Sequence, residues 1–365
     1  MLFAYKYVPH QMEKMQEFID FIFYEVWCKA STSGAFSLDL FSAKPALHEV
    51  MEAFFYSDAK GADFFYGHVE RIYRLFAQLT GPQIQHFELW FRGNNDIEKI
   101  CDNDPAVHLV RYADVPAVHK DLCDELGSFF KGLYSQSLLG LVALQDKIGD
   151  IDDHYAAFVK VNDEGKCPFC GISDVFGVYH SKREAYDHYL PKALYPFNSI
   201  NFRNLVPACH HCNSSYKTSK DPAFTVKDPA RSAHRRRVFY PYRTNAQKIE
   251  ISVTVAHADF KALAPGDISI DFGPPEIDEE LDTWRDVYDI DERYKAKIVG
   301  KNDGKYWITQ AFDEWPARGG TVGEYVADLA RQADVSPFAD CNFLKRALLE
   351  ACWNVGRDPP QAATA

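Results

Sequence analysis

The sequence predicts an α+β protein in three parts: a mainly helical N-terminal domain over residues 1–160, a small irregular domain over 161–245, and a C-terminal region over 246–365 with a short strand pair and helices. Three observations predict this class. Apolar residues recur at three- and four-residue steps along the first part, two Cys-x-x-Cys pairs bound the second, and an alternating apolar run opens the third. At 365 residues the chain is also too long for one small core.

The first part is expected to consist of helices that each bury one face. Apolar side chains at helical spacing are Met12, Met15, Ile19, Ile22 and Val26, then Leu47, Val50, Met51 and Phe54 behind Pro45, then Val69, Ile72, Tyr73, Phe76 and Leu79. Gly81-Pro82 is expected to close the third helix, Gly93-Asn94-Asn95-Asp96 to form a loop, and residues 115–147 to return to helix. Such stripes indicate a core, and the domain is interpreted as a recognition or docking unit.

The second part changes composition, with more Pro, Asn, Ser, Cys and His and weak helical periodicity. A small irregular fold of this kind usually needs a metal, because its apolar core is too small. A structural zinc ion can supply on the order of 10–16 kcal/mol of folding free energy at neutral pH.

The third part begins with strand patterns. Ile249, Ile251, Val253 and Val255 alternate with polar residues, and Ile268, Ile270 and Phe272 repeat the pattern before Gly273-Pro274-Pro275. Helices are expected over 278–298, 304–315, 321–333 and 337–354, followed by a frayed tail from Arg357.

The four cysteines of the second part have the spacing of a single zinc site. They are Cys167, Cys170, Cys209 and Cys212. Four thiolates complete a tetrahedral shell and leave no open position, so this zinc is expected to be structural. His210 and His211 lie inside the second pair and are the alternative ligands. The remaining cysteines are interpreted as reduced core residues, which are Cys28, Cys101, Cys123, Cys341 and Cys352.

The formal net charge of −12 is distributed unevenly. Residues 166–243 hold 13 Lys and Arg against 5 Asp and Glu, so a basic segment lies inside an acidic chain and coincides with the cysteine-bounded part. A basic segment of this kind favours local phosphate binding. A run of about 18 apolar residues and the pattern of a signal peptide are both absent, which predicts a cytoplasmic protein without a membrane span.

A second group of polar residues lies between and just after the cysteine pairs: Asp187, His188, Asn204 and Asn213. Carboxylate and amide oxygens are hard donors that suit Mg²⁺ or Mn²⁺, with water and phosphate completing the shell. A histidine beside such a metal can accept a proton from an attacking water near neutral pH. This chemistry suits the hydrolysis of a phosphodiester.

The order of these motifs resembles the HNH endonuclease family, in its form with a four-cysteine zinc knuckle and a ββα-metal core. The elements in order are Cys167 and Cys170, Asp187-His188-Tyr189-Leu190-Pro191, Asn204-Leu205-Val206-Pro207, Cys209, Cys212-Asn213 and Lys217. The resemblance covers about residues 165–222. Asn213 stands where relatives often have His, and the gap from Asn213 to Lys217 is one residue longer than in some of them.

The resemblance implies a role for each of these residues. Asp187, on the first strand, and Asn213, at the first turn of the helix, would be ligands of a catalytic Mg²⁺ or Mn²⁺. His188 would be the general base. Asn204 would orient the His188 ring or pin the loop between the strands, and Lys217 would neutralise phosphate.

The basic residues of the second part are expected to form the phosphate-facing surface. They are Lys182, Arg183, Lys192, Arg203, Lys217, Lys220, Arg231, Arg235, Arg236 and Arg237. The resemblance implies DNA as the substrate, nicking by a monomer or paired cutting by a homodimer, and a setting in a bacterial restriction or anti-phage system beside an ATPase or other subunit.

Two other functions share part of this pattern. A zinc-stabilised nucleic-acid binding module without catalysis remains the alternative, although binding alone gives no reason for Asp187, His188 and Asn213 at metal-ligand spacing. A zinc deaminase is excluded, because it requires His-x-Glu a few tens of residues before Pro-Cys-x-x-Cys and neither cysteine pair follows a proline.

Overall fold

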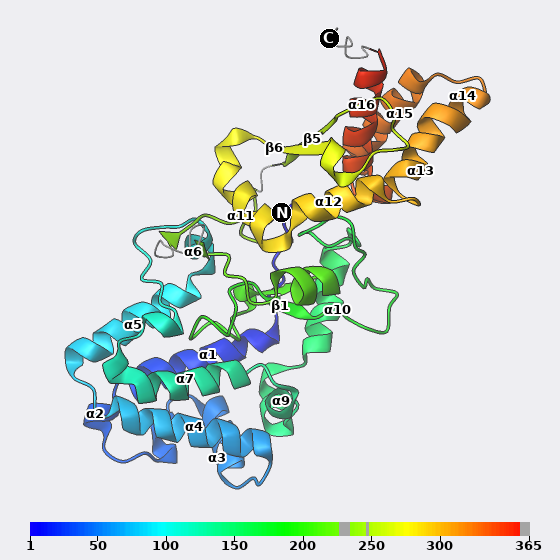
Figure 1. The fold of residues 1–365 in the computed structure, drawn as a ribbon. Coiled ribbons are helices and arrows are strands. Elements are labelled where there is room, and N and C mark those ends of the chain that lie inside the picture. The colour runs from blue at the N-terminus through cyan, green and yellow to red at the C-terminus, as the bar shows by residue number, and fades with distance from the viewer. Residues whose placement is uncertain (226–233, 246–247, 358–365) are drawn as a thin grey trace.

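A computed structural model describes residues 1–225, 234–245 and 248–357. The α+β prediction is confirmed, since helices dominate and the strands form two-stranded antiparallel sheets (Figure 1). Arg231 and the predicted frayed tail beyond Arg357 lie outside the described residues.

Helices fill the N-terminal part and lie together in the lower half of Figure 1. They are η1 (Gln11–Glu13), α1 (Lys14–Phe21), η2 (Ile22–Trp27), α2 (Ala30–Ser33), η3 (Leu38–Phe41), α3 (Pro45–Phe55), α4 (Lys60–Phe76), α5 (Gly81–Asn95), α6 (Ile97–Cys101), η4 (Tyr112–Asp114), η5 (Ala117–His119), α7 (Lys120–Gly132), α8 (Gln136–Leu139), α9 (Val142–Ile148) and α10 (Ile151–Val161).

The predicted apolar stripes of these helices form the core of the N-terminal part. Trp27 is fully buried, and its ring stacks on Phe76 with centroids 5.9 Å apart. The Trp27 indole N–H donates to the carbonyl of Val69 at 3.0 Å, so the buried ring leaves no polar atom unpaired. Burial of aromatic side chains of this size supplies most of the hydrophobic stabilisation of such a bundle.

The prediction of a loop over Gly93-Asn94-Asn95-Asp96 is wrong. Helix α5 continues through Asn95, and Asp96 caps α6. Gly93 is needed because a Cβ there would lie 2.4 Å from the carbonyl oxygen of His108. Gly81-Pro82 likewise opens α5 behind Thr80 instead of closing α4, in keeping with the preference of proline for the first helical turn.

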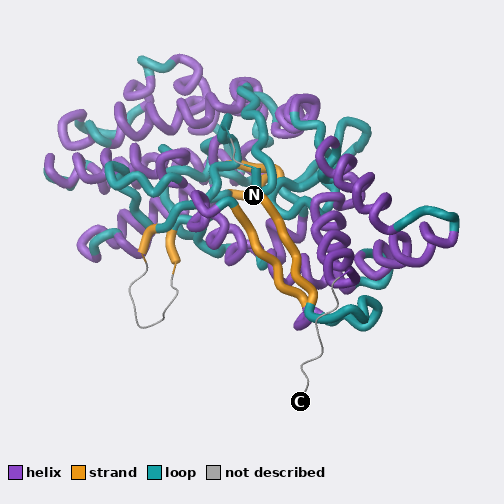
Figure 2. The backbone as a smooth tube through the Cα atoms, turned by 90° about the horizontal axis from the view of Figure 1, so that it is seen from above, coloured by secondary structure: helices purple, strands orange, loops and turns teal. Residues whose placement is uncertain are grey.

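The middle part contains a short hairpin followed by a helix. Strands β1 (Tyr186–His188) and β2 (Leu205–Pro207) pair antiparallel, with Asp187 opposite Val206. The one-turn η6 (Phe202–Asn204) precedes β2, and the wide π-helix η7 (His211–Lys217) follows it. The order is therefore strand, strand, helix, as the ββα core requires. A separate pair, β3 (Phe224–Thr225) and β4 (His234–Arg235), lies to one side (Figure 2).

The C-terminal part has the predicted strand pair. Strands β5 (Glu250–Val255) and β6 (Ile268–Gly273) are antiparallel and form the long ribbon in Figure 2. The helical elements are η8 (Pro265–Asp267), η9 (Pro275–Ile277), α11 (Asp278–Tyr288), α12 (Ile290–Val299), α13 (Gly304–Thr309), η10 (Gln310–Glu314), α14 (Trp315–Ala317), α15 (Val322–Val335), η11 (Ala339–Cys341) and α16 (Asn342–Arg357). The stretch predicted as one helix over 278–298 is two, because Asp289 adopts a left-handed conformation with φ of 48°.

The first residues of the chain run through the centre of the molecule, beside α11 and α12 (Figure 1). The Leu2 N–H donates to the Pro168 carbonyl and the Tyr5 N–H to the Pro241 carbonyl, both at 2.9 Å. Buried hydrophobic residues from Met1 to Cys352 form one continuous cluster across all three parts. The division at 160 and 245 into units that fold separately stays a prediction.

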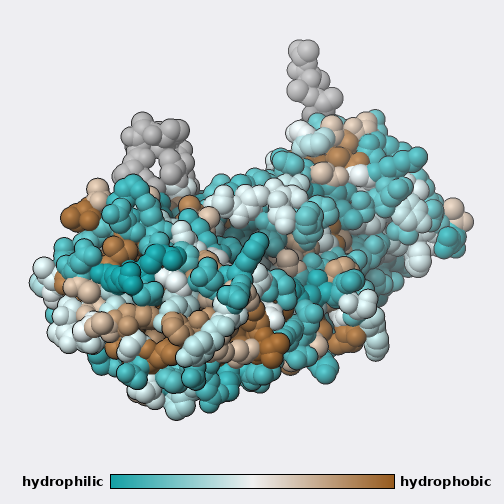
Figure 3. All heavy atoms as spheres, turned by 90° about the horizontal axis from the view of Figure 1, so that it is seen from below, coloured by the Kyte–Doolittle hydropathy of each residue, from teal (hydrophilic) through white to brown (hydrophobic). Residues whose placement is uncertain are grey.

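The outer face shown in Figure 3 is mainly hydrophilic, with hydrophobic side chains gathered in scattered patches. Among the described helices, none has the length and the apolar character that crossing a bilayer would require.

Candidate metal centre and catalytic site

The four cysteines of the two Cys-x-x-Cys pairs meet at one point. The sulfur atoms of Cys167, Cys170, Cys209 and Cys212 all lie within 4.8 Å of one another, and all four residues are buried. Gly171 follows the first pair with φ of +66°, which lets its N–H donate to the Cys167 carbonyl at 2.8 Å. The four thiols can hold a metal ion such as zinc. His210 and His211 are exposed and stand outside this cluster.

A buried arginine from the C-terminal part lies against the cysteine cluster. The Arg293 guanidinium on α12 donates to the Cys212 sulfur at 3.2 Å and stacks over the Tyr216 ring at 4.5 Å. Four thiolates around a divalent ion would carry two negative charges, and Arg293 offsets one of them. Tyr216 belongs to η7, so the same side chain supports the helix that carries Asn213.

The C-terminal part holds the first cysteine pair as well. The Trp284 indole N–H on α11 donates to the Phe169 carbonyl at 2.6 Å, and the Tyr294 hydroxyl on α12 donates to the Cys170 carbonyl at 3.0 Å. All of these groups are buried. Hydrogen bonds to backbone carbonyls fix the loop of a metal site in place before the ion binds.

Asp187, at the centre of β1, is buried beside a lysine. The Lys217 ammonium donates to Asp187 Oδ1 and to the His188 carbonyl, both at 2.9 Å, and the Lys217 side chain has no exposed surface. Burial raises the pKa of Asp187, and the lysine opposes that rise. The other oxygen, Oδ2, is buried without a hydrogen-bond partner. A buried carboxylate oxygen left free in this way is suited to a cation.

The His188 ring is held by a single hydrogen bond. Its Nε2 lies 2.9 Å from the carbonyl oxygen of Ser199. A carbonyl can only accept, so Nε2 carries the proton and Nδ1 keeps its lone pair. Burial, assisted by Lys192, lowers the pKa of His188 to about 3, and the ring is therefore neutral near neutral pH. The Tyr134 ring meets the imidazole edge-on at 5.0 Å.

Asn204 joins both ends of the loop between the two strands. Its amide N–H donates to the carbonyls of Leu190 at 3.0 Å and Asn198 at 3.2 Å, and its carbonyl accepts from the Leu190 N–H at 2.7 Å. Of the two roles expected for Asn204, the contacts are those of loop pinning. Because Asn198 precedes Ser199, the pinned loop is also the one that carries the hydrogen-bond acceptor of His188.

The same loop is gripped from the N-terminal part by asparagines that the sequence analysis did not single out. Asn94 donates to the Pro196 carbonyl at 2.9 Å, and Asn198 donates to the Asn94 carbonyl at 3.2 Å. Asn95 and Asn201 pair in the same way. The sequence signal was the recurrence of asparagine in both segments, but the pairing joins residues about one hundred positions apart and cannot be read from spacing.

Asn213 lies in the first turn of η7, as expected. Its N–H donates to the Cys209 carbonyl and its carbonyl accepts from Thr218, both at 3.0 Å. The latter bond spans five residues, so the π-helical winding accommodates the extra residue between Asn213 and Lys217. The two side chains are about one turn apart and share a face. The Asn213 amide makes no hydrogen bond within the described residues, which leaves its carbonyl oxygen available as a ligand.

Most residues predicted to contact nucleic acid form ion pairs or hydrogen bonds with other residues of this chain. Five are paired with carboxylates, namely Arg183 with Asp152, Lys217 with Asp187, Lys220 with Asp289, Arg236 with Asp286, and Arg237 with Glu280. Lys217 and Arg236 are also buried. The structure thus makes Lys217 the partner of Asp187, and its phosphate contact stays a prediction that this placement does not favour.

Three more bind backbone or aromatic groups. Lys192 donates to the Lys131 carbonyl at 3.1 Å, Arg235 donates to the Asp104 carbonyl at 3.0 Å, and Arg203 stacks over the Tyr7 ring at 4.5 Å. Arg203 remains exposed and could still meet a phosphate.

Comparison with known proteins gives one local similarity. Over 80 residues the chain is 31% identical to the Septu protein PtuB of Bacillus thuringiensis. The match covers 21% of this chain and 31% of PtuB, so it spans about a third of that protein's length. No family model matches the chain, and no solved structure matches it.

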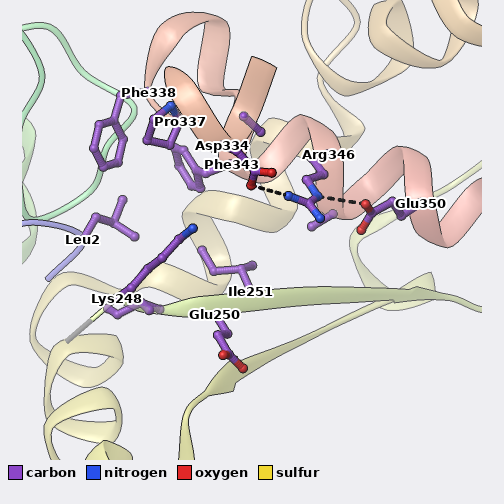
Figure 4. Close-up of a pocket in the computed structure, with 13 residues that line it drawn as sticks. Leu2, Lys248, Glu250, Ile251, Asp334, Pro337, Phe338, Phe343, Arg346 and Glu350 are labelled. Carbon is purple, nitrogen blue, oxygen red and sulfur yellow. Dashed lines mark hydrogen bonds and ion pairs between the residues drawn. The ribbon is translucent and has the colours of Figure 1, made fainter. Parts of the chain in front are cut away.

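A pocket in the C-terminal part takes in none of the predicted site residues. It has a volume of about 630 Å³ and lies between β5 and helices α15 and α16 (Figure 4). Arg346 at its wall is bonded to Asp334 at 2.9 Å and to Glu350 at 2.8 Å. The charge of Arg346 is therefore offset within the wall, and Lys248 and Glu250 are the other charged residues that line the pocket.

Proposed function

We propose that this protein is a metal-dependent HNH-type endonuclease that hydrolyses DNA phosphodiester bonds. The observation that carries the proposal is the pair Asp187 and His188 on β1. One offers a buried carboxylate oxygen without a partner, and the other offers a neutral imidazole nitrogen with a free lone pair. A metal ligand and a base on adjacent residues of one strand are the parts that metal-assisted hydrolysis needs.

The second metal ligand would be Asn213. Its amide makes no hydrogen bond to the residues that the structure describes, and it shares a face of η7 with Lys217, whose ammonium already reaches Asp187. Two oxygen donors with water and phosphate in the remaining positions suit Mg²⁺ or Mn²⁺. When bound there, such an ion would polarise the phosphate and stabilise the charge that develops on the leaving oxygen.

His188 would accept the proton of the attacking water at Nδ1. The Ser199 carbonyl fixes the tautomer, Tyr134 limits the tilt of the ring, and Asn204 holds the loop that carries Ser199. The four cysteines would bind a structural zinc ion, because a closed tetrathiolate shell leaves no position for substrate.

The proposal also includes the biological system in which the protein acts. The local similarity to a Septu protein is compatible with a role in an anti-phage defence system. An ATPase or another subunit would then act beside this chain, and two copies would make a double-strand break where one makes a nick.

The test is cleavage of supercoiled plasmid by the purified protein with Mg²⁺ or Mn²⁺. Removal of a general base costs about 10²–10⁴-fold in rate, so His188→Ala should abolish visible product. His86→Ala, which alters an exposed histidine on α5, is the matched control and should cut normally. Nicked or linear product that persists in His188→Ala would reject the assignment.

Metal binding gives a readout that does not depend on cleavage. Titration calorimetry with Mn²⁺ should detect a site in the wild type that is lost in Asp187→Ala. DNA binding without cleavage, together with no Mn²⁺ site, would instead favour the zinc-stabilised binding module.

A further inference from the structure

Most residues of the predicted basic surface are occupied by contacts within the protein, but some cations near β1 are not. A pocket of about 530 Å³ lies between α10 and the segment that leads into β1. Its basic lining residues are Lys160, Lys182 and Arg183, and Asp152 is its one carboxylate. Arg183 pairs with Asp152. Within the parts of the chain that the structure describes, neither lysine is paired with a carboxylate, so two positive charges face the pocket without a counterion.

The walls of the pocket are held in place by hydrogen bonds. The Tyr155 hydroxyl on α10 donates to the Phe176 carbonyl at 2.6 Å, which ties the helix to the opposite wall. The Gly177 N–H donates to His180 Nδ1 at 3.0 Å, and the Phe176 N–H donates to the Glu184 carboxylate at 3.3 Å. The pocket is therefore a formed feature of the fold, with imidazole and hydroxyl donors from His180 and Ser181 at its edge.

The pocket adjoins the candidate catalytic strand. Ala185, which lines the pocket, directly precedes β1, and the Ala185 carbonyl continues the pairing with β2 by accepting from the Ala208 N–H. His188 lies three positions after Ala185, a span of roughly 10 Å along an extended strand. Stacked nucleotides rise about 3.4 Å each along one strand, so this span corresponds to about three nucleotides.

Exposed side chains continue from the pocket lining, because Val178 lines the pocket and Tyr179 follows it in the chain. Tyr179 is 98% exposed and Val178 is 51% exposed, although neither is required by the core. An exposed aromatic ring three positions before Lys182 in the chain suits a nucleic-acid strand, in which charged phosphates alternate with sugars and bases.

We propose that this pocket binds the DNA backbone a few nucleotides from the scissile bond, with Lys160 and Lys182 contacting phosphate oxygens and Tyr179 contacting the adjoining sugar or base. The inference rests on the proposed function for the position of the scissile bond. The pocket would replace the buried Lys217 and Arg236 as the site of phosphate recognition.

The test measures binding apart from cleavage. In the His188→Ala background, the affinity for a labelled duplex of 30 base pairs is measured by fluorescence anisotropy between 50 and 200 mM salt. Two phosphate contacts contribute about a tenfold fall in affinity over this range. The double variant Lys160→Gln with Lys182→Gln should remove that fall. The salt slope, which is the slope of log affinity against log salt concentration, should decrease in magnitude by about two. The matched control is Lys60→Gln with Lys301→Gln, which removes the same charge from exposed positions elsewhere.

Affinity and salt slope equal to those of the control would overturn the pocket proposal, and so would the absence of any DNA binding by the parent protein. A selective loss in the pocket variant supports it. This result is separable from the proposed function. If the pocket variant loses binding while the wild type never cuts plasmid, the pocket stands and the nuclease assignment fails. If the pocket variant cuts plasmid normally and binds DNA with unchanged affinity, the nuclease assignment stands and the pocket proposal fails.

Discussion

Lys217 and Asp187 form an ion pair in which the lysine side chain has no exposed surface and the carboxylate side chain has 4%. The pair joins η7 to β1, the two elements that would share a catalytic metal. Because Lys217 occupies Oδ1 and leaves Oδ2 free, the lysine both neutralises the carboxylate and leaves one oxygen for a cation.

Loss of the lysine should therefore destabilise the fold. Breaking a buried ion pair by removing one partner costs about 3–5 kcal/mol, since the other charge stays buried. Lys217→Met should lower the free energy of unfolding by that amount in urea denaturation. Asp187→Asn with Lys217→Met should cost less than the sum of the two single variants. Additive costs would show that the two side chains do not interact in solution.

Arg293 is expected to hold the metal at the cysteine cluster. A hydrogen bond to a charged group contributes about 1.5–3 kcal/mol, so Arg293→Met should lose about 2 kcal/mol of stability and release zinc several-fold faster to a chelator. Arg331→Met, at an exposed ion pair on α15, is the control and should change neither. Zinc release at the wild-type rate from Arg293→Met would refute the role.

The hydrogen bonds of Asn94 to the loop between β1 and β2 predict that a change at Asn94 lowers the cleavage rate. Asn94→Ala leaves the buried carbonyls of Val110 and Pro196 and the Val110 N–H without partners, which costs about 2 kcal/mol or more. A loosened loop should also lower the cleavage rate about tenfold through misplacement of His188. Asn302→Ala, in an exposed turn, is the control. Should the Asn94 variant cut at the wild-type rate under conditions where it is folded, the loop does not position His188.

His154 makes stability depend on pH. Its Nδ1 accepts from the Tyr186 hydroxyl and its Nε2 donates to the Val8 carbonyl, and burial lowers its pKa from 6.5 to about 4. The folded state thus favours the neutral ring, and protonation favours the unfolded chain. Stability should be fully present above pH 6.5 and be lost as the pH falls toward 4.

His154→Gln isolates this contribution. The stability curves of the wild type and the variant, measured by urea denaturation at several pH values, should converge as the pH falls through this window. His188 shifts in the same direction and affects both proteins equally. Parallel curves would mean that the pKa of His154 is the same in the folded and the unfolded chain, so that the ring does not contribute to the pH dependence.

The sequence determined the features that follow from local order and ligand chemistry. Cysteine spacing predicted the cluster of four thiols, and alternation predicted β5 and β6. The motif order predicted a hairpin followed by a helix, with Asp187 on the first strand and Asn213 in the first turn. These are short-range properties, because a turn, a strand or a pair of ligands depends on residues a few positions apart.

The tertiary structure decided which charges face solvent and which residues hold the site. A basic segment in the sequence does not reveal that Arg236 pairs with Asp286, fifty positions away. The sequence also does not reveal that the Asn95 amide donates to the carbonyl of Phe197, 102 positions away. The sequence writes both residues as lysine, but Lys217 is buried in an ion pair with Asp187 and Lys182 is exposed. Only the placement of distant segments sets the solvation and the partners of each charge, and these set what that charge can bind.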